Sequence, residues 1–115
     1  MKYLLLIYHA ESLMADLTPE MGEKILGEYM AYGAELKKRG AHIAGEGLQP
    51  VMTAKTVRVR NGKPIHTDGP FAETKEQLGG FYLIDVRTVE EALELAAMIP
   101  DAKAGSVEVR PVMEY

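Results

Sequence analysis

The order of the elements predicted along this chain favours an α+β fold, in which two helices cover one face of an antiparallel sheet. Two apolar runs, residues 2–8 and 79–86, are typical of central strands that are buried on both faces. Helical patterns follow each of these strands and begin at Thr18 and at Thr88. An alternating segment at 105–114 supplies a last strand. The resulting order corresponds to the ferredoxin-like plan, a βαβ…βαβ frame with an inserted hairpin.

The first predicted helix has clear signals at both ends. Thr18 fits the N-cap position and Pro19 the first helical position, where the missing N–H is not needed. An apolar stripe then follows at spacings of three and four residues: Met21, Ile25, Tyr29, Tyr32 and Leu36. Gly40 suits the left-handed conformation that commonly ends a helix. The helix also contains glycines that each cost about 1 kcal/mol relative to alanine, so we expect close packing at Gly22, Gly27 and Gly33.

The middle of the chain is predicted to form a short strand followed by a hairpin. Residues 41–48 form a strand that reaches a glycine-rich bend. Residues 53–60 alternate between apolar and polar side chains, as a half-buried strand does. The Asn61-Gly62 pair is the strongest short signal for a hairpin turn, and it returns the chain through residues 63–67.

The second predicted helix begins with a capping box. Thr88 is followed three residues later by Glu91, a pairing that satisfies free N–H groups at a helix start. The apolar pattern continues to Ile99, and Pro100 closes the helix.

Length and composition limit the class of protein. The 115 residues suffice for one domain with its own core, and we predict a single domain over residues 1–115. The net charge of −4 argues against a nucleic-acid or anionic-membrane surface, because both require basic residues. The chain has no cysteine, which excludes disulfides and thiolate chemistry and favours a cytoplasmic setting. No apolar run approaches the roughly 18 residues of a membrane span, and the N-terminal aliphatic run is too short for a signal peptide.

The helix-free face of the predicted sheet is expected to need a cover, because its strands are apolar on both sides. A second copy of the chain is the simplest cover, so we predict a homodimer formed by sheet-to-sheet packing. Apart from this copy, the only partner expected is a small-molecule ligand.

Three blocks of sequence resemble one known family. They are TDGPFAETKEQLGGFYLIDV at 67–86, GEGLQP at 45–50 and GSVEVRP at 105–111. In this order they resemble the DGPF group of the YCII-related proteins, whose namesake motif is present at residues 68–71. The resemblance covers nearly the whole chain and implies a ferredoxin-like fold that dimerises into an αβ-barrel. It implies no established reaction. Better-known members look like small-molecule enzymes with a His–Asp pair in a cleft, for which this chain offers no clearly matching histidine.

The loop that carries the DGPF motif is the first candidate site. Asp68 cannot accept the usual Asx-turn hydrogen bond, because the residue two positions on is Pro70, which has no N–H. Its carboxylate is therefore predicted either to accept from the Phe71 N–H as a structural cap or to face a ligand. Phe71 is expected to fix the loop in the core and to border a ligand pocket, with Glu73 and Lys75 as further charged candidates. Turn-forming residues and charge runs equally serve a purely structural, solvated loop.

Three residues elsewhere could join this site. Glu46 lies between two glycines at a strand end, where small-molecule sites often form, although it can equally be a surface acid in a turn. Tyr8, at the end of the first strand, lines the same predicted pocket or belongs to the core. His66 is the histidine best placed for acid–base work, because residues two apart in an extended segment share a face, which brings it toward Asp68. The three histidines do not have the spacing of metal ligands, and no cofactor motif is present.

Three functions remain open on the sequence. The first is a small-molecule enzyme in which Asp68, Glu46, Glu73 and His66 perform acid–base catalysis in a cleft. The second is a non-catalytic dimeric module that binds a ligand or a partner. The third is a structural dimer whose DGPF loop locks the fold, in which case Asp68→Asn would lower stability. We favour the first.

Overall fold

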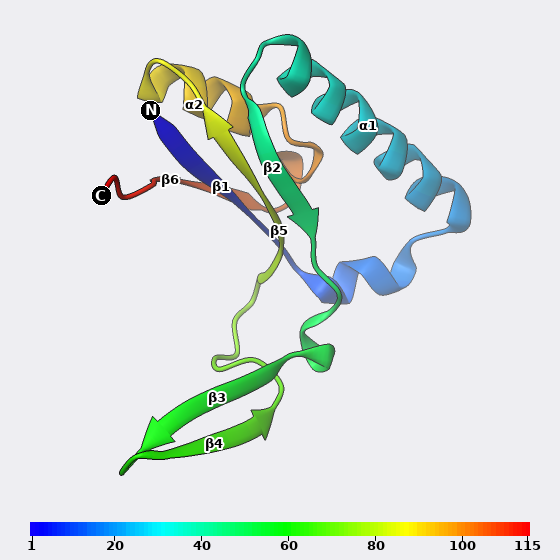
Figure 1. The fold of residues 1–115 in the computed structure, drawn as a ribbon. Helices are drawn as coiled ribbons and strands as arrows, with labels where there is room; N and C mark the ends of the chain where they lie inside the picture. The colour runs from blue at the N-terminus through cyan, green and yellow to red at the C-terminus, as the bar shows by residue number, and fades with distance from the viewer.

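The computed structural model describes residues 1–115 and contains a four-stranded antiparallel sheet with two helices on one face (Figure 1). The strands of this sheet are β1 (Lys2–His9), β2 (His42–Gly47), β5 (Gln77–Asp85) and β6 (Ser106–Pro111). The helices are α1 (Pro19–Lys38) and α2 (Val89–Ala97). The strand order β2-β5-β1-β6 places the two apolar strands in the centre, as the ferredoxin-like plan requires. The predicted α+β fold is confirmed.

Helix α1 begins and ends where the sequence predicts. The Thr18 hydroxyl accepts a hydrogen bond from the Met21 N–H at 3.2 Å, and Gly40 has a φ of 71° beyond the last turn. The expectation of close packing at its three interior glycines is wrong within this chain. A Cβ added at Gly22, Gly27 or Gly33 would meet no atom within 4 Å.

Helix α2 is shorter than the apolar pattern predicts. The Thr88 hydroxyl accepts from the Glu91 N–H at 3.2 Å, as expected of the N-cap. The helix ends at Ala97, and a 3₁₀ turn, η3 (Pro100–Lys103), follows. Two further 3₁₀ turns are η1 (Glu11–Asp16) and η2 (Val51–Thr53). Neither helix is long and apolar enough to cross a membrane.

The core lies between the sheet and the two helices. Its most deeply buried side chains are Leu5, Leu36, Ile84, Leu95 and Ile99. Burying a leucine or isoleucine side chain contributes about 1.5–3 kcal/mol, so these five hold the helices on the sheet. Tyr32 adds a polar contact, because its hydroxyl donates to the Leu95 carbonyl at 2.8 Å.

The opposite face of the sheet has no helix over it. Strand alternation turns Leu4, Leu6 and Tyr8 of β1 to this face, together with Phe81 and Leu83 of β5. All five are only partly buried. The face therefore presents an apolar strip along the two central strands.

A two-stranded hairpin projects from the body of the protein, on the side away from α1 (Figure 1). It consists of β3 (Lys55–Arg60) and β4 (Lys63–Asp68), which pair with each other and with no strand of the main sheet. The turn is formed by Asn61 and Gly62, whose φ values of 52° and 75° fit the type I′ hairpin turn predicted from the sequence. We call residues 55–68 the arm.

Candidate functional site

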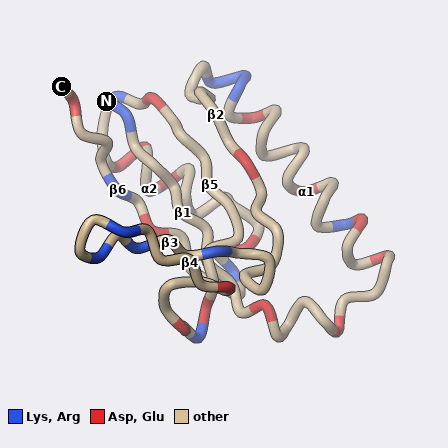
Figure 2. Tube along the Cα trace, turned by 60° about the horizontal axis from the view of Figure 1, so that its bottom comes forward, with Lys and Arg blue, Asp and Glu red and all other residues tan.

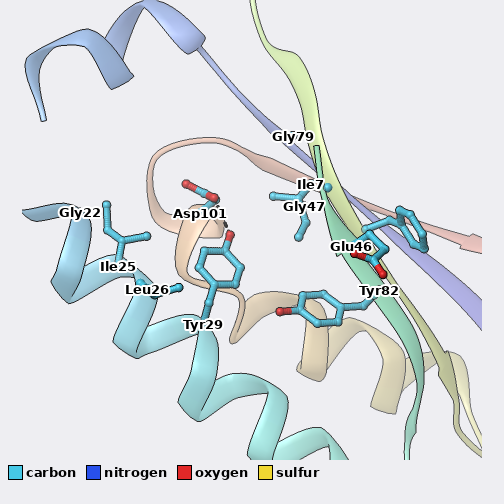
Figure 3. A pocket seen from close by; sticks show the side chains of 13 residues that line it. Ile7, Gly22, Ile25, Leu26, Tyr29, Glu46, Gly47, Gly79, Tyr82 and Asp101 are labelled. Carbon is cyan, nitrogen blue, oxygen red and sulfur yellow. Dashed lines mark hydrogen bonds between the residues drawn. The ribbon is translucent and has the colours of Figure 1, made fainter. Parts of the chain in front are cut away.

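A cavity of about 450 Å³ lies between α1 and the part of the sheet formed by β2 and β5 (Figure 3). Its walls come from α1, β1, β2, β5 and η3. The lining residues are Ile7, Gly22, Ile25, Leu26, Tyr29, Gly45, Glu46, Gly47, Gly79, Gly80, Phe81, Tyr82 and Asp101. A volume of this size suits a small organic molecule. No lysine or arginine is among the lining residues.

Glycines on the sheet side leave room for this cavity. A Cβ added at Gly45 would lie 2.7 Å from the Tyr82 ring, and one at Gly80 would lie 2.8 Å from the Glu46 carbonyl oxygen. Real Cβ atoms do not approach other atoms so closely, so neither position accepts a side chain without movement of its neighbours. The "GEG" and "GG" blocks of the sequence therefore form the wall of the cavity.

A bulge in β5 brings a histidine to this wall. Ile7 pairs with Gly80 and Tyr8 pairs with Leu78, so the register between β1 and β5 skips Gly79. The ring of His9, on β1, occupies the space above Gly79, where an added Cβ would lie 2.2 Å from the ring. His9 does not itself line the cavity, but its ring lies against Gly79, which does.

The most direct polar contact in the cavity joins Tyr29 and Asp101. The Tyr29 hydroxyl donates to Asp101 Oδ2 at 2.5 Å, which connects α1 with η3 (Figure 3). Burial raises the pKa of Tyr29 well above its ordinary value of 10, and the hydrogen bond to the Asp101 carboxylate raises it further. The phenol therefore stays protonated and acts as a donor to the carboxylate at neutral pH.

His9 is the second titratable group beside this carboxylate. Its Nδ1 lies 3.9 Å from Asp101 Oδ2, and this buried atom has no hydrogen-bond partner. The two side chains are 20% and 27% exposed, respectively. A shift of about 1 Å would bring them within hydrogen-bonding distance. His9 and Asp101 therefore lie side by side without forming a hydrogen bond.

Tyr82 completes the aromatic wall. Its ring packs edge-to-face on Tyr32 with the ring centroids 5.1 Å apart, and it projects toward Tyr29 (Figure 3). Burial raises the pKa of Tyr82 above its ordinary value, so this phenol also stays neutral. The cavity thus contains two neutral phenols and one carboxylate.

Glu46 is among the residues that line the cavity, whereas Tyr8 is not, and strand alternation turns both side chains away from it. Glu46 pairs with Phe81 across β2 and β5, whereas its neighbours Gly45 and Gly47 pair with Tyr82 and Gly80. Because side chains alternate along a strand, the Glu46 carboxylate lies on the helix-free face. Tyr8 lies on the same face by the alternation of β1.

The DGPF loop lies outside the cavity. The Asp68 side chain is 88% exposed and accepts a hydrogen bond from Lys55 Nζ at 2.7 Å, so neither the predicted cap from Phe71 nor a contact with His66 is formed. Phe71 is 79% exposed, and the expectation that it fixes the loop in the core is wrong. The structure does not bring His66, Glu73 or Lys75 to the cavity either, since all three are exposed and none lines it.

The residues that meet in the cavity or directly beside it come from distant parts of the chain. In the sequence, Tyr29 belongs to an apolar helical stripe. His9 follows the first predicted strand, and Asp101 follows the proline that closes the second predicted helix. No local spacing connects positions 9, 29 and 101, so a sequence pattern does not show that these residues meet. The structure contains no group of three or more His, Cys, Asp or Glu side chains that could hold a metal ion.

Comparison with known proteins finds one family over the whole chain. The profile of the YCII-related domain matches residues 1–115. A protein of Rhizobium meliloti (strain 1021), named "Uncharacterized protein R00369", is 39% identical over 117 residues, which cover 100% of this chain and 94% of that protein.

Proposed function

Because the chain belongs to the YCII-related family and holds a carboxylate between two proton-carrying side chains at a cavity, we propose that it is a small-molecule enzyme that uses acid–base chemistry. The single observation that supports this most is the Asp101 carboxylate, which accepts from Tyr29 at 2.5 Å and lies 3.9 Å from His9. A titratable group with two such neighbours in a cavity is the arrangement that proton transfer requires.

Asp101 is the proposed catalytic base. Its Oδ2 accepts the Tyr29 hydroxyl, which stabilises the ionised carboxylate, and Oδ1 makes no hydrogen bond within the protein. Oδ1 can therefore accept a proton from a substrate C–H, N–H or O–H in the cavity. His9 acts through Asp101 as a positioning residue: as an imidazolium it stabilises the carboxylate, and as a neutral imidazole it can take over its proton.

The walls of the cavity define a class of substrate. They are largely apolar and aromatic, Asp101 is the carboxylate that faces the cavity, and no lysine or arginine lines it. An anionic substrate would be repelled by Asp101 and would lose its hydration without a counter-charge. We therefore propose a neutral or cationic small molecule with an acidic proton, such as a neutral carbonyl compound.

The proposal includes a homodimer in which the helix-free faces of two sheets pack into an αβ-barrel. The apolar strip of Leu4, Leu6, Tyr8, Phe81 and Leu83 supports it, because stacked sheets bury such faces at a separation of about 10 Å. Sedimentation should give a stable dimer at micromolar concentration. Leu6→Asp should shift it to a folded monomer, and a monomeric wild-type protein would contradict this part. The absence of cysteine fits a cytoplasmic location.

A non-catalytic ligand-binding module is the second candidate. The observation in its favour is the 3.9 Å separation between His9 Nδ1 and Asp101 Oδ2, which is too long for a hydrogen bond. If ligands bind without shortening it, the pair would not relay protons.

Deuterium exchange separates these two candidates. A library of neutral carbonyl compounds and phenols is first screened for binding by ligand-observed NMR. The compounds that bind are then incubated with the protein in D₂O, and loss of the C–H signal next to the carbonyl reports proton abstraction directly. We expect exchange with the wild-type protein and a loss of about 10²–10⁴-fold with Asp101→Asn at retained binding.

Glu46→Gln is the matched control, because it removes a carboxylate from the opposite face of the same wall. It should leave exchange unchanged. Exchange that survives Asp101→Asn would refute the enzyme proposal, and binding without any exchange would favour the module.

A further inference from the structure

The arm is exposed on both of its faces. Alternation places Val57, Val59 and Pro64 on one face and Arg58, Arg60, Ile65 and Lys63 on the other. Val57 is 59% exposed and Val59 is 61% exposed. An isolated two-stranded hairpin is marginally stable in water at best, so an arm of this kind is expected to rest on another surface.

The arm also differs from the body in charge. It carries Lys55, Arg58, Arg60 and Lys63 against the single acid Asp68, a net charge of +3 with its histidine neutral, whereas the whole chain carries −4. The remaining residues therefore carry −7. Figure 2 shows the basic residues gathered on β3 and β4, apart from the acidic residues of the helices. Opposite charges on two parts of one chain favour contact between copies.

The outer surface of α1 carries charges of the opposite sign to those of the arm, beside exposed apolar side chains. We define the α1 outer surface by four exposed side chains, Glu20, Glu23, Leu26 and Met30. Leu26 and Met30, one helical turn apart, are 62% and 69% exposed, and the two acids lie on the turns before them. Gly27 lies between them with open space above it, which allows another backbone to approach closely.

The arm cannot reach this surface on its own body. In both views it projects away from α1 (Figures 1 and 2). Its six-residue strands span about 20 Å, whereas stacked sheets lie only about 10 Å apart. In a dimer formed by the helix-free faces, the arm is therefore long enough to pass the partner's sheet and extend toward its helix layer.

We propose that the arm of one protomer lies against the α1 outer surface of a second copy, with Arg58, Arg60 and Lys63 facing Glu20 and Glu23 and with Ile65 packed near Leu26 and Met30. This inference rests on the proposed homodimer but not on the proposed chemistry. Since Leu26 also lines the cavity, the partner's arm would border the mouth of the site.

An intermolecular paramagnetic measurement tests the contact. Because the chain has no cysteine, Val59→Cys provides a single attachment point for a spin label. The spin-labelled protein, which contains no ¹⁵N, is mixed with ¹⁵N-labelled wild-type protein. Only contacts between copies can then broaden the ¹⁵N signals. We expect broadening of the amide signals of residues 20–30. A spin label on α2 at Glu90→Cys is the control and should leave these signals unchanged.

Sedimentation of the same samples separates the possible failures. A monomer would overturn both the homodimer and the arm contact. A dimer whose broadened signals lie elsewhere, or are absent, would overturn the arm contact alone and leave the sheet-to-sheet dimer standing.

Charge reversal gives an independent test. The pair Arg58→Glu and Arg60→Glu should raise the dimer dissociation constant about tenfold at low salt, and so should the pair Glu20→Lys and Glu23→Lys. The four substitutions together should restore the wild-type value, because they re-create the attraction with inverted signs. Glu90→Lys with Glu114→Lys, two exposed acids outside the α1 outer surface, should change it less than twofold. No change with either pair, or no restoration, would overturn the contact.

Discussion

The Tyr29 hydroxyl and the Asp101 carboxylate form a 2.5 Å hydrogen bond between residues 72 positions apart in the chain. This bond joins the middle of α1 to the turn that follows α2, and both of its residues line the cavity that we propose as the site. It therefore has a structural effect and a chemical one, and these can be measured separately.

Tyr29→Phe should lower the free energy of unfolding by about 1–3 kcal/mol, because a partly buried carboxylate loses its donor. Proton exchange in the cavity should also fall, since the ionised form of Asp101 is no longer stabilised. Urea unfolding measures the first effect and deuterium incorporation the second. Tyr115→Phe, a change at a fully exposed tyrosine, is the control and should alter neither. Unchanged stability in Tyr29→Phe would mean that the bond is weak in solution.

The stability of the protein should fall as the pH rises above about 10. Burial raises the pKa of Tyr29 and of Tyr32 above the ordinary value of 10, and Tyr29 also has Asp101 beside it. The folded state thus keeps these protons where the unfolded state loses them, so the stabilisation is complete below pH 10 and is lost as the pH rises further. Urea unfolding between pH 8 and 11 should show this decline. The double variant with Tyr29→Phe and Tyr32→Phe should show a clearly shallower one, and an equal slope would contradict the assignment.

Gly79→Ala should disturb the site without altering the rest of the fold. The new methyl group would lie 2.2 Å from the His9 ring, so the ring must move or the bulge must open. We expect a destabilisation of about 1–3 kcal/mol and a shift of the His9 ring signals in the NMR spectrum. Gly47→Ala is a matched control in the same wall, because an added Cβ there meets no atom within 4 Å. If the two variants behave alike, His9 does not occupy the described position.

Asp68→Asn should have almost no effect on stability. The carboxylate is 88% exposed and its ion pair with Lys55 is a surface one, and such pairs contribute about 0–1 kcal/mol. The melting temperatures of the variant and of the wild type should therefore agree within about 5 °C. A large loss of stability would contradict this expectation and would support a structural role of the DGPF loop in stabilising the fold.

The fold could be predicted because its signals are local. The caps of the two helices, the Asn61-Gly62 turn and the apolar central strands each depend on neighbouring residues. Their order along the chain then leaves few possible arrangements. Phe71 is the exception, because whether an aromatic residue in a loop is buried depends on whether a surface lies beside it. Here the loop lies next to the arm and not over the core.

The site could not be predicted in the same way. Glu46 lies in the wall of the cavity, but the side of the strand to which its carboxylate points depends on the register with β5. The bulge at Gly79 decides the position of His9, and nothing in the sequence specifies which of two adjacent glycines is skipped. Only the folded sheet brings His9 and Asp101 within 4 Å of each other.

Substitutions at the glycines of the cavity wall can change the volume of the cavity in one direction only. At Gly45, Gly47, Gly79 and Gly80 every possible substitution adds atoms, so each single change on that wall can only reduce the space available. Relatives that accept larger ligands must therefore gain the space from the opposite wall, at Ile25, Leu26 or Tyr29, where smaller side chains are available. Within this family, differences in ligand size should accordingly correlate with substitutions in α1 and not with substitutions in the sheet.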